Sequence, residues 1–302
     1  MNIRDLQYVV AVADAGHFGR AALACHVSQP ALSGQIKKLE ARLGVALFER
    51  GNRSVRITPV GARIVGRARV LLALSDEITE LARAARDPLA GPFRLGMIAT
   101  VGPYLAPLVL SALHAAMPEL ELTLVEGMTR DLEADLARGE LDAVIQATLP
   151  VDTGLRAVAL YDEPFLVALA AEHPLAVGGS VDLASIPEAE LLLLADGHCL
   201  RDQVLGACHR SGGGANTRET SLETLLALVA AGDGVTLVPE LVAQRAREGV
   251  VFLPVADGVA GRDVVLVSRA GFPRGQVLEV LAGVVRERVA LHRAEAVRIN
   301  RS

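Results

Sequence analysis

The sequence predicts a small, mainly helical N-terminal domain, a long connecting helix, and a larger α/β domain of two lobes. The first observation is a change of charge: residues 1–70 contain 11 Arg or Lys against 4 Asp or Glu, a net charge of +7. The whole chain carries −5, so residues 71–302 carry −12. The other two observations are an apolar repeat over residues 60–85 and an alternation of strand-like and helix-like segments beyond residue 88. A basic head on an acidic body indicates that the head alone meets a polyanion.

The basic head has the pattern of a helix-turn-helix. Apolar residues recur at helical spacing over 3–15, and a second, short helix is expected over 18–26. A tight turn at Val27 and Ser28 leads into a polar helix over 29–43, where Pro30 suits the first turn. In this pattern the second helix of the pair enters the major groove of double-stranded DNA. A charged helical bundle that contacts no DNA is the alternative.

Residues 47–58 predict a small hairpin that would grip DNA phosphates as a basic wing. We therefore expect polar residues of the second helix and arginines of the wing to contact DNA. These residues are Ser28, Gln29, Pro30, Ser33, Gln35 and Lys37 on the helix, and Arg50 and Arg53 in the wing.

A long helix is predicted after the hairpin, with Thr58 as N-cap and Pro59 as its first residue. Its apolar seam, broken once by an arginine, consists of Val60, Ile64, Arg67, Leu71, Leu74, Ile78, Leu81 and Ala85. A heptad seam of this length needs a partner, so we expect a homodimer formed through this helix. Packing of the helix on its own domain is the alternative. The predicted domains are 1–58 for DNA binding, 59–87 for the linker and 88–302 for the body.

The body alternates apolar runs with amphipathic segments. Strands are expected at 93–98, 120–126, 141–147, 164–170, 191–195, 235–239, 250–254 and 264–268, and helices at 104–117, 129–138, 221–231 and 275–292. Strands joined by crossover helices predict parallel sheets covered on both faces, and the length suits two lobes with a cleft. Ligands of such sheets bind where strand ends meet helix N-termini.

Two cysteines, Cys199 and Cys208, lie nine positions apart in a stretch with helical spacing that the glycines at 212–214 end. Nine helical residues rise about 13.5 Å and turn about 900°, which places the two sulfurs on opposite faces. A disulfide needs Cα atoms closer than about 7 Å, so this pair forms a bond only if the helix unwinds. Oxidation here would therefore be a conformational event.

Cysteine usage also bears on location. The third cysteine, Cys25, falls in an apolar helical run, where a buried, inert thiol is expected. Sparse cysteines suit a reducing cytosol. Charged residues interrupt the N-terminal apolar run, and no stretch reaches the length of a membrane span, so we expect a soluble, cytoplasmic protein without membrane partners.

The segment HFGRAALACHVSQPALSGQIKKLEARLGVALFER, followed by a wing and a linker helix, resembles the LysR-type transcriptional regulators. Gly34 stands where most members carry arginine, a departure that is similar to the peroxide-sensing OxyR branch. The motifs IATVGPYLAP at 98–107, GHCLRDQ at 197–203 and TSLETL at 220–225 also resemble that branch. The similarity extends over nearly the full length.

The resemblance implies a winged helix-turn-helix, a linker helix, and a regulatory domain like a periplasmic binding protein. The chain would cross between lobes near 160–164 and 261–265, giving one lobe of about 88–162 with 265–302 and another of about 163–264. It implies a transcriptional activator of the oxidative-stress response rather than an enzyme. Its partners would be double-stranded promoter DNA, hydrogen peroxide, RNA polymerase and cytosolic thiol reductants, and it would form a homotetramer of two dimers.

The same resemblance implies the roles of the site residues. The Cys199 thiolate, favoured by its position at a helix N-terminus, would attack peroxide and then pair with Cys208. Hydroxyl groups would come from Thr100 and Thr129, and His198 and Asp202 would orient water or peroxide. Arg262 would favour the thiolate. Neither a cofactor nor a metal is implied.

Three other interpretations of these residues compete with this one. His198, Cys199, Cys208 and His209 could bind zinc, although a helix would separate them and the spacing matches no common finger. A cysteine phosphatase needs arginine six positions after its cysteine, and Leu205 stands there. The stronger alternative is a LysR-type regulator whose effector is a small molecule in the interlobe cleft, with the cysteines incidental.

Overall fold

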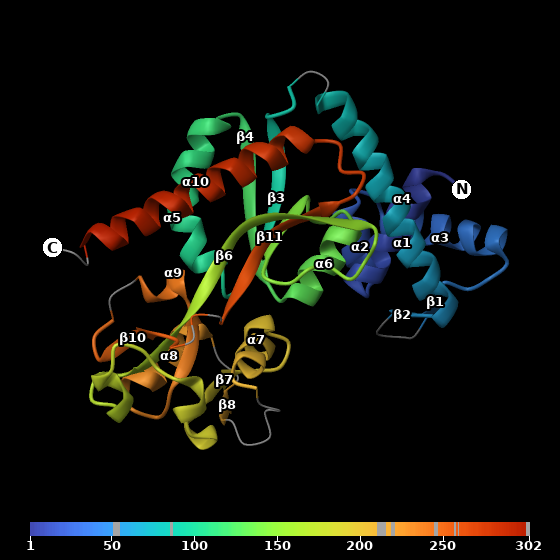
Figure 1. The fold of residues 1–302 in the computed structure, drawn as a ribbon. Coiled ribbons are helices and arrows are strands. Elements are labelled where there is room, and N and C mark those ends of the chain that lie inside the picture. The colour runs from blue at the N-terminus through green and yellow to red at the C-terminus, as the bar shows by residue number, and fades with distance from the viewer. Residues whose placement is uncertain are drawn as a thin grey trace. The chain divides into compact units, whose positions relative to one another are not determined.

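The computed structural model describes residues 1–50, 55–84, 87–209, 216–218, 221–244, 247–256, 258 and 260–299. The chain forms two compact units, residues 1–86 with 138–140, and residues 87–137 with 141–302 (Figure 1). None of the described helices is both long and apolar enough to span a bilayer.

The N-terminal unit begins with three helices, α1 (Ile3–Ala15), α2 (Phe18–Ala24) and α3 (Gln29–Leu43), whose predicted bounds are confirmed for α1 and α3. Side chains cap all three: the Asn2 side chain accepts from the N–H of Asp5, His17 Nδ1 accepts from Gly19, and Ser28 accepts from Ala31. The helix α2 ends before His26, which has a left-handed backbone with φ of 53°. Cys25 is the C-cap of α2 and is half-buried rather than buried, because it stands at the helix end.

The predicted hairpin and linker helix are also confirmed. Strands β1 (Phe48–Arg50) and β2 (Val55–Ile57) pair antiparallel. The helix α4 (Pro59–Ala84) starts after Thr58, whose hydroxyl accepts from the N–H of Gly61 at 2.9 Å. Val65 and Ala68 of α4 are buried in this unit. Leu71, Leu74 and Ile78 of the predicted seam are exposed, Ile78 by 70%, so in the single chain α4 buries a different face.

The second unit contains one sheet of seven strands and a small pair. The large sheet has the order β10–β6–β11–β5–β3–β4, with β9 also paired to β6. Its strands are β3 (Gly91–Ile98), β4 (Leu120–Gly127), β5 (Ala143–Gln146), β6 (Leu155–Ala170), β9 (Thr236–Pro239), β10 (Val250–Pro254) and β11 (Gly261–Arg269). The small pair is β7 (Leu192–Leu194) with β8 (Asn216–Arg218).

The expectation of parallel sheets is correct only in part. Strand β3 pairs parallel with β4 and β5, and β7 pairs parallel with β8. The other pairs are antiparallel, because β6 and β11 are long strands that run in opposite directions through both lobes. Pro164 lies opposite Gly261 in this pair, and a register shift follows at Val264/Val265.

The helices of the second unit are α5 (Gly102–Ala116), α6 (Thr129–Ala137), α7 (Cys199–Ala207), α8 (Leu222–Ala230), α9 (Glu240–Ala243) and α10 (Gly275–Ile299). The helix α10 packs against α5 and β6, α6 packs against β3 and β5, and α7 and α8 both pack against β7 (Figure 1). Short 3-10 helices lie at Pro174–Val177, Leu183–Ser185 and Glu188–Glu190. The fully buried Phe93 and Phe165 belong to one continuous apolar core. The fold is therefore the predicted pair of α/β lobes, joined by β6 and β11.

Candidate functional site

Cys199 is the first residue of α7, and Cys208 is the C-cap of the same helix. Both side chains are half-buried free thiols. The turn before the helix passes through Gly197, whose φ of 97° favours glycine, and His198 is the N-cap. The two cysteines therefore lie at opposite ends of the helix. The glycines at 212–214 lie outside the described residues.

A small cavity lies beside Cys199, at the point where two strand ends meet two helix starts. Strands β3 and β4 are parallel and end at the same edge of the sheet, while α6 and α7 begin there. The residues around the cavity are Ile98, Ala99, Thr100, Gly127, Met128, Thr129, Gly197, His198 and Cys199. Its volume of about 10 Å³ has the scale of one water-sized molecule.

Arg262 approaches the same site from β11. Its side chain is 1% exposed, and its Nη1 donates to the hydroxyl oxygen of Thr100 at 3.0 Å. Its Nη2 donates to the Thr100 carbonyl at 3.1 Å. On the other side, Nε donates to Glu163 Oε2 at 2.9 Å. The structure therefore brings together Cys199, Thr100, Thr129, His198 and Arg262 from the predicted set.

Burial is the largest influence on the titration of the site. Burial raises the pKa of the Cys199 thiol above its ordinary value. The Arg262 charge, a hydrogen bond from the Thr129 hydroxyl, and the backbone N–H groups of Leu200 and Cys199 lower this pKa, but by less. The backbone N–H groups at the start of α7 and the Arg262 charge therefore favour the thiolate, as expected, but burial outweighs them. Burial also lowers the pKa of His198, which keeps its imidazole neutral near pH 7.

Asp202 is not brought to the cavity. The buried face of α7 consists of Leu200 and Val204, four positions apart, so the side chain midway between them lies on the outer face. Asp202 is accordingly exposed. Its neighbour Arg201 pairs instead with Asp196 at 2.8 Å and donates to the Leu194 carbonyl at 3.1 Å.

The zinc alternative finds no support in the geometry. The length of α7 separates His198 and Cys199 from Cys208 and His209. Within the part of the chain that the structure describes, no three His, Cys, Asp or Glu side chains are grouped as metal ligands.

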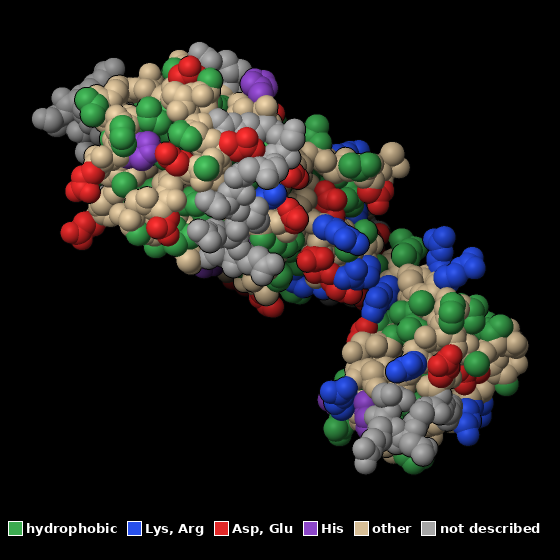
Figure 2. Space-filling view, turned by 90° about the horizontal axis from the view of Figure 1, so that it is seen from below, with side chains coloured by type: hydrophobic (Ala, Val, Ile, Leu, Met, Phe, Trp, Pro, Cys, Tyr) green, Lys and Arg blue, Asp and Glu red, His purple; other side chains and the backbone are tan. Residues whose placement is uncertain are grey.

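The predicted DNA-contacting residues lie on α3 and the hairpin. Gln29, Pro30 and Lys37 are exposed, and Ser33 is half-buried. Figure 2 shows more Lys and Arg than Asp and Glu side chains on the N-terminal unit, at the lower right. The side chain of Arg50 and all of Arg53 lie outside the described residues.

Two of these residues serve the fold as well. The Ser28 hydroxyl caps α3. Gln35 Nε2 donates to the buried Asp5 at 2.8 Å, and this hydrogen bond is the main reason that the pKa of Asp5 is lowered. The Gln35 side chain therefore ties α3 to α1, since a residue on the inner edge of α3 faces the first helix. The expected DNA contact of Gln35 stays a prediction.

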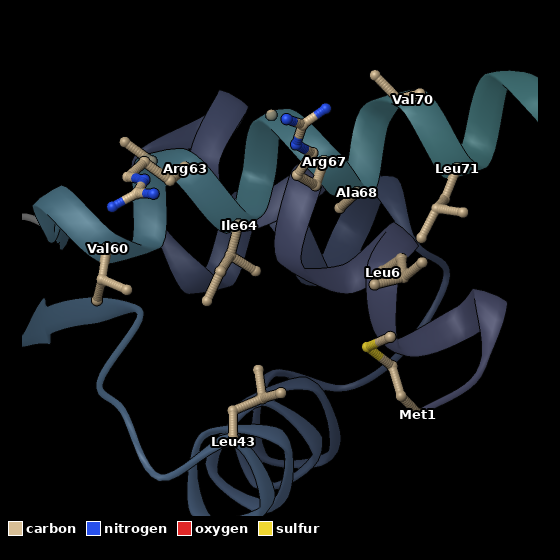
Figure 3. A pocket seen from close by; sticks show the side chains of 12 residues that line it. Met1, Leu6, Leu43, Val60, Arg63, Ile64, Arg67, Ala68, Val70 and Leu71 are labelled. Carbon is tan, nitrogen blue, oxygen red and sulfur yellow. The ribbon is translucent and has the colours of Figure 1, made fainter.

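An open apolar groove of about 770 Å³ runs between α4 and the ends of α1 and α3. In Figure 3, Val60, Ile64 and Leu71 of α4 point into it from one side, and Leu6 and Leu43 from the others. Arg63, Arg67 and Val70 also belong to its lining. Four of the seam positions, Val60, Ile64, Arg67 and Leu71, thus line this groove.

Comparison with known families identifies the kind of protein in which this site lies. Residues 3–62 match the family model of the bacterial regulatory helix-turn-helix proteins of the LysR family, and residues 86–290 match the LysR substrate binding domain. The chain belongs to the LysR family. It is thus a DNA-binding transcription regulator rather than an enzyme, and it lies in the OxyR branch of that family.

Relatives in this branch match nearly the whole chain. The hydrogen peroxide-inducible genes activator of Escherichia coli O6:H1 is 46% identical over 296 residues, which is 97% of each chain. The structure of full-length Pseudomonas aeruginosa OxyR with a Cys-to-Asp substitution is 41% identical, with a TM-score of 0.80 over 95% of each chain. A Cys-to-Ser mutant of Corynebacterium glutamicum OxyR with H2O2 bound is 34% identical, with a TM-score of 0.67 over 99% of this chain and 96% of that one.

Sequence reasoning missed contacts of further residues in this unit, two of them at the site. Gln203 of α7 donates to the Ala147 carbonyl at 2.7 Å, and the Tyr104 hydroxyl donates to Glu223 Oε1 at 2.8 Å. Glu163 holds Arg262, and Met128 lines the cavity. Gln203, Tyr104 and Glu223 lie inside the motifs that carry the family resemblance, so those motifs could have pointed to them. No sequence signal marks Glu163 and Met128, because their contacts come from distant segments.

Proposed function

We propose that this LysR-family regulator binds promoter DNA and senses hydrogen peroxide through oxidation of Cys199. The observation that carries the proposal is a cysteine at a helix N-terminus, facing a cavity of small-molecule size with two threonine hydroxyls and a neutral histidine. The relatives named above, one a peroxide-inducible activator and one solved with H2O2 bound, support the same ligand. A cavity of this size suits peroxide better than a larger effector molecule.

Hydrogen peroxide is the oxidant, and it is reduced as Cys199 is oxidised. The Cys199 thiolate attacks one peroxide oxygen, the O–O bond breaks, and the leaving hydroxide takes a proton to become water. Cys199 is then a sulfenic acid. The Cys208 thiolate attacks its sulfur and displaces hydroxide, which is protonated to a second water, and the S–S bond forms. Thr100 and Thr129 hold the peroxide by their hydroxyls, and His198 orients it.

Disulfide formation requires that α7 unwinds, and few buried side chains anchor this helix. Its buried residues are Leu200 and Val204, and a second small cavity beneath them is lined by both. Gln203 adds a hydrogen bond to the first lobe. We infer that pairing of Cys199 with Cys208 releases these contacts and re-spaces the DNA-binding units of the oligomer.

The remaining assignments follow the predicted domains. Residues 1–58 bind double-stranded promoter DNA through Ser28, Gln29, Pro30, Ser33, Gln35, Lys37, Arg50 and Arg53. Residues 59–87 dimerise the chain, residues 88–302 sense peroxide, and two dimers form a homotetramer. The oxidised form recruits RNA polymerase, and cytosolic thiol reductants restore the dithiol.

A peroxide titration tests the proposal. Purified protein with a promoter fragment is treated with stoichiometric H2O2, and DNA binding and thiol content are followed together. The parent should change its DNA footprint as two thiols are lost, and Cys199→Ser should not respond. Cys25→Ser, which removes the thiol distant from the site, is the matched control and should respond like the parent. A Cys199→Ser protein that responds as the parent does would refute the proposal.

A further inference from the structure

Glu163 is a buried carboxylate in β6, in the segment where this strand pairs with β11. Its side chain and that of Arg262 are each 1% exposed, and Glu163 Oε2 lies 2.8 Å from Nη2 and 2.9 Å from Nε of Arg262. Two N–H groups of the guanidinium converge on one carboxylate oxygen, and two charge-assisted contacts of this kind restrict how the guanidinium is oriented. Glu163 therefore determines where Arg262 points.

Glu163 is itself held at both oxygens. While Oε2 accepts from Arg262, Oε1 accepts from the backbone N–H of Leu241 at 3.0 Å. Leu241 lies in the first turn of α9, whose N-cap Pro239 offers no side-chain hydrogen bond. Rotation of the carboxylate would break one of these contacts, so its position is fixed by the second lobe.

Arg262, held in this way, in turn positions Thr100 of the first lobe. The Thr100 hydroxyl oxygen accepts from Arg262 Nη1, and the Thr100 carbonyl accepts from Nη2. A threonine hydroxyl has one hydrogen and two lone pairs. Because the oxygen accepts from Arg262, its own hydrogen is directed elsewhere, and Thr100 lines the cavity with Cys199.

We propose that Glu163 is a positioning residue for the oxidation of Cys199, acting through Arg262 to aim the Thr100 hydroxyl at a peroxide in the cavity. This inference rests on the proposed function. In Glu163→Gln, one acceptor oxygen is replaced by an NH2 group, and the negative charge that pairs with Arg262 is lost. The one remaining oxygen cannot accept from both Arg262 and the N–H of Leu241, so either the clamp on Arg262 or the contact that fixes the side chain is lost. Arg262 is then held less firmly, and Thr100 loses its fixed donor direction. A displacement of about 1 Å in such a group can cost about 10²-fold in rate.

The test uses the full-length chain with Cys25→Ser and Cys208→Ser, which leaves Cys199 as its one thiol. Rate constants of Cys199 with H2O2 and with iodoacetamide are measured at the same pH values. Both reagents react with the thiolate, so their ratio cancels the ionised fraction and reports positioning of the peroxide alone. We expect the ratio to fall at least about tenfold in Glu163→Gln.

Matched variants show whether the change in this ratio is due to the contact between Glu163 and Arg262. Glu240→Gln removes a carboxylate that pairs with Arg293 at 2.7 Å and should leave the ratio within about twofold of the parent. In an Arg262→Gln background, adding Glu163→Gln should change nothing further, because Glu163 acts through Arg262. If Glu163→Gln does not fold by circular dichroism, Glu163→Asp decides, since it keeps the charge and withdraws the clamp by one methylene.

A folded Glu163 variant with the parental ratio of rate constants would overturn the inference. The inference would also fail if adding Glu163→Gln to Arg262→Gln lowered this ratio as much as Glu163→Gln does alone. Failure of the proposed function gives a different result. In that case the parent itself would react with H2O2 no faster than free cysteine does.

Discussion

At Cys199, burial and charge act against each other. Burial raises the pKa of the thiol, and the charge of Arg262 is the largest influence that lowers it. The resting thiol is therefore protonated at neutral pH to a greater extent than its helix N-terminal position alone would give. Such a thiol resists general electrophiles, while a peroxide that fills the cavity meets donors already in place.

Arg262→Gln should move the pH profile of Cys199 alkylation toward higher pH. The positive charge stabilises the thiolate, so its removal raises the pKa of Cys199 further. At pH 7 the alkylation rate should fall several-fold, because less of the thiol is ionised. Arg293→Gln, which removes an arginine that pairs with Glu240, is the control. A profile that stays in place in a folded Arg262→Gln protein would remove Arg262 from the account.

Thr129→Val should slow the reaction with peroxide at least about tenfold. The valine keeps the shape of the side chain and removes the hydroxyl that donates to the Cys199 sulfur and lines the cavity. The ratio of peroxide to iodoacetamide rate constants is the measurement. Thr123→Val, a threonine earlier in β4 that does not line the cavity, is the matched control. Equal ratios in the two variants would mean that Thr129 only fills space.

At the scale of elements, α7 is the part that the account requires to change shape. Among the described residues, α7 buries two side chains, Leu200 and Val204, whereas α8 buries Leu222, Leu225, Leu226 and Val229. The helix with fewer buried side chains is the one that costs less to unwind.

Val204→Ala should make the Cys199–Cys208 disulfide harder to reduce. Two buried methyl groups contribute about 2 kcal/mol to the folded α7, and this contribution is absent once the helix unwinds. The reduced form is therefore destabilised, and the potential should fall by about 40 mV in glutathione equilibration. Val229→Ala removes the same groups from α8 and should leave the potential unchanged. Equal potentials in the two variants would indicate that α7 stays folded on oxidation.

The sequence predicts correctly those elements whose ends depend on neighbouring residues. The bounds of α1 and α3 follow from their capping residues, and the start of α4 from Thr58 and Pro59. Strand direction was missed, because antiparallel pairing of β6 with β11 depends on segments a hundred residues apart. The same holds for the site: Cys199 and its helix were predictable from spacing, but the outward face of Asp202 and the clamp of Glu163 on Arg262 depend on packing.

For the whole molecule, the exposed seam of α4 predicts how two chains associate. Leu74 and Ile78 are 49% and 70% exposed in the single chain. Exposed apolar residues at heptad spacing favour a partner helix. Leu74→Glu with Ile78→Glu should therefore shift the protein toward monomers by at least about a hundredfold in dimer dissociation constant. Sedimentation equilibrium is the measurement.

Thr79→Glu provides the control for this variant. Thr79 is exposed on α4 but lies outside the seam, so a charge there should leave the dimer intact. Dimers of unchanged affinity in the Leu74→Glu, Ile78→Glu protein would place the interface elsewhere.

The most direct test of the whole account is hydrogen exchange of residues 199–208 with thiol mapping, before and after one equivalent of H2O2. The account predicts a bond between the two cysteines and fast amide exchange throughout α7, with α8 still protected. Both sulfurs recovered as free thiols, in a segment whose amides remain protected, would contradict it.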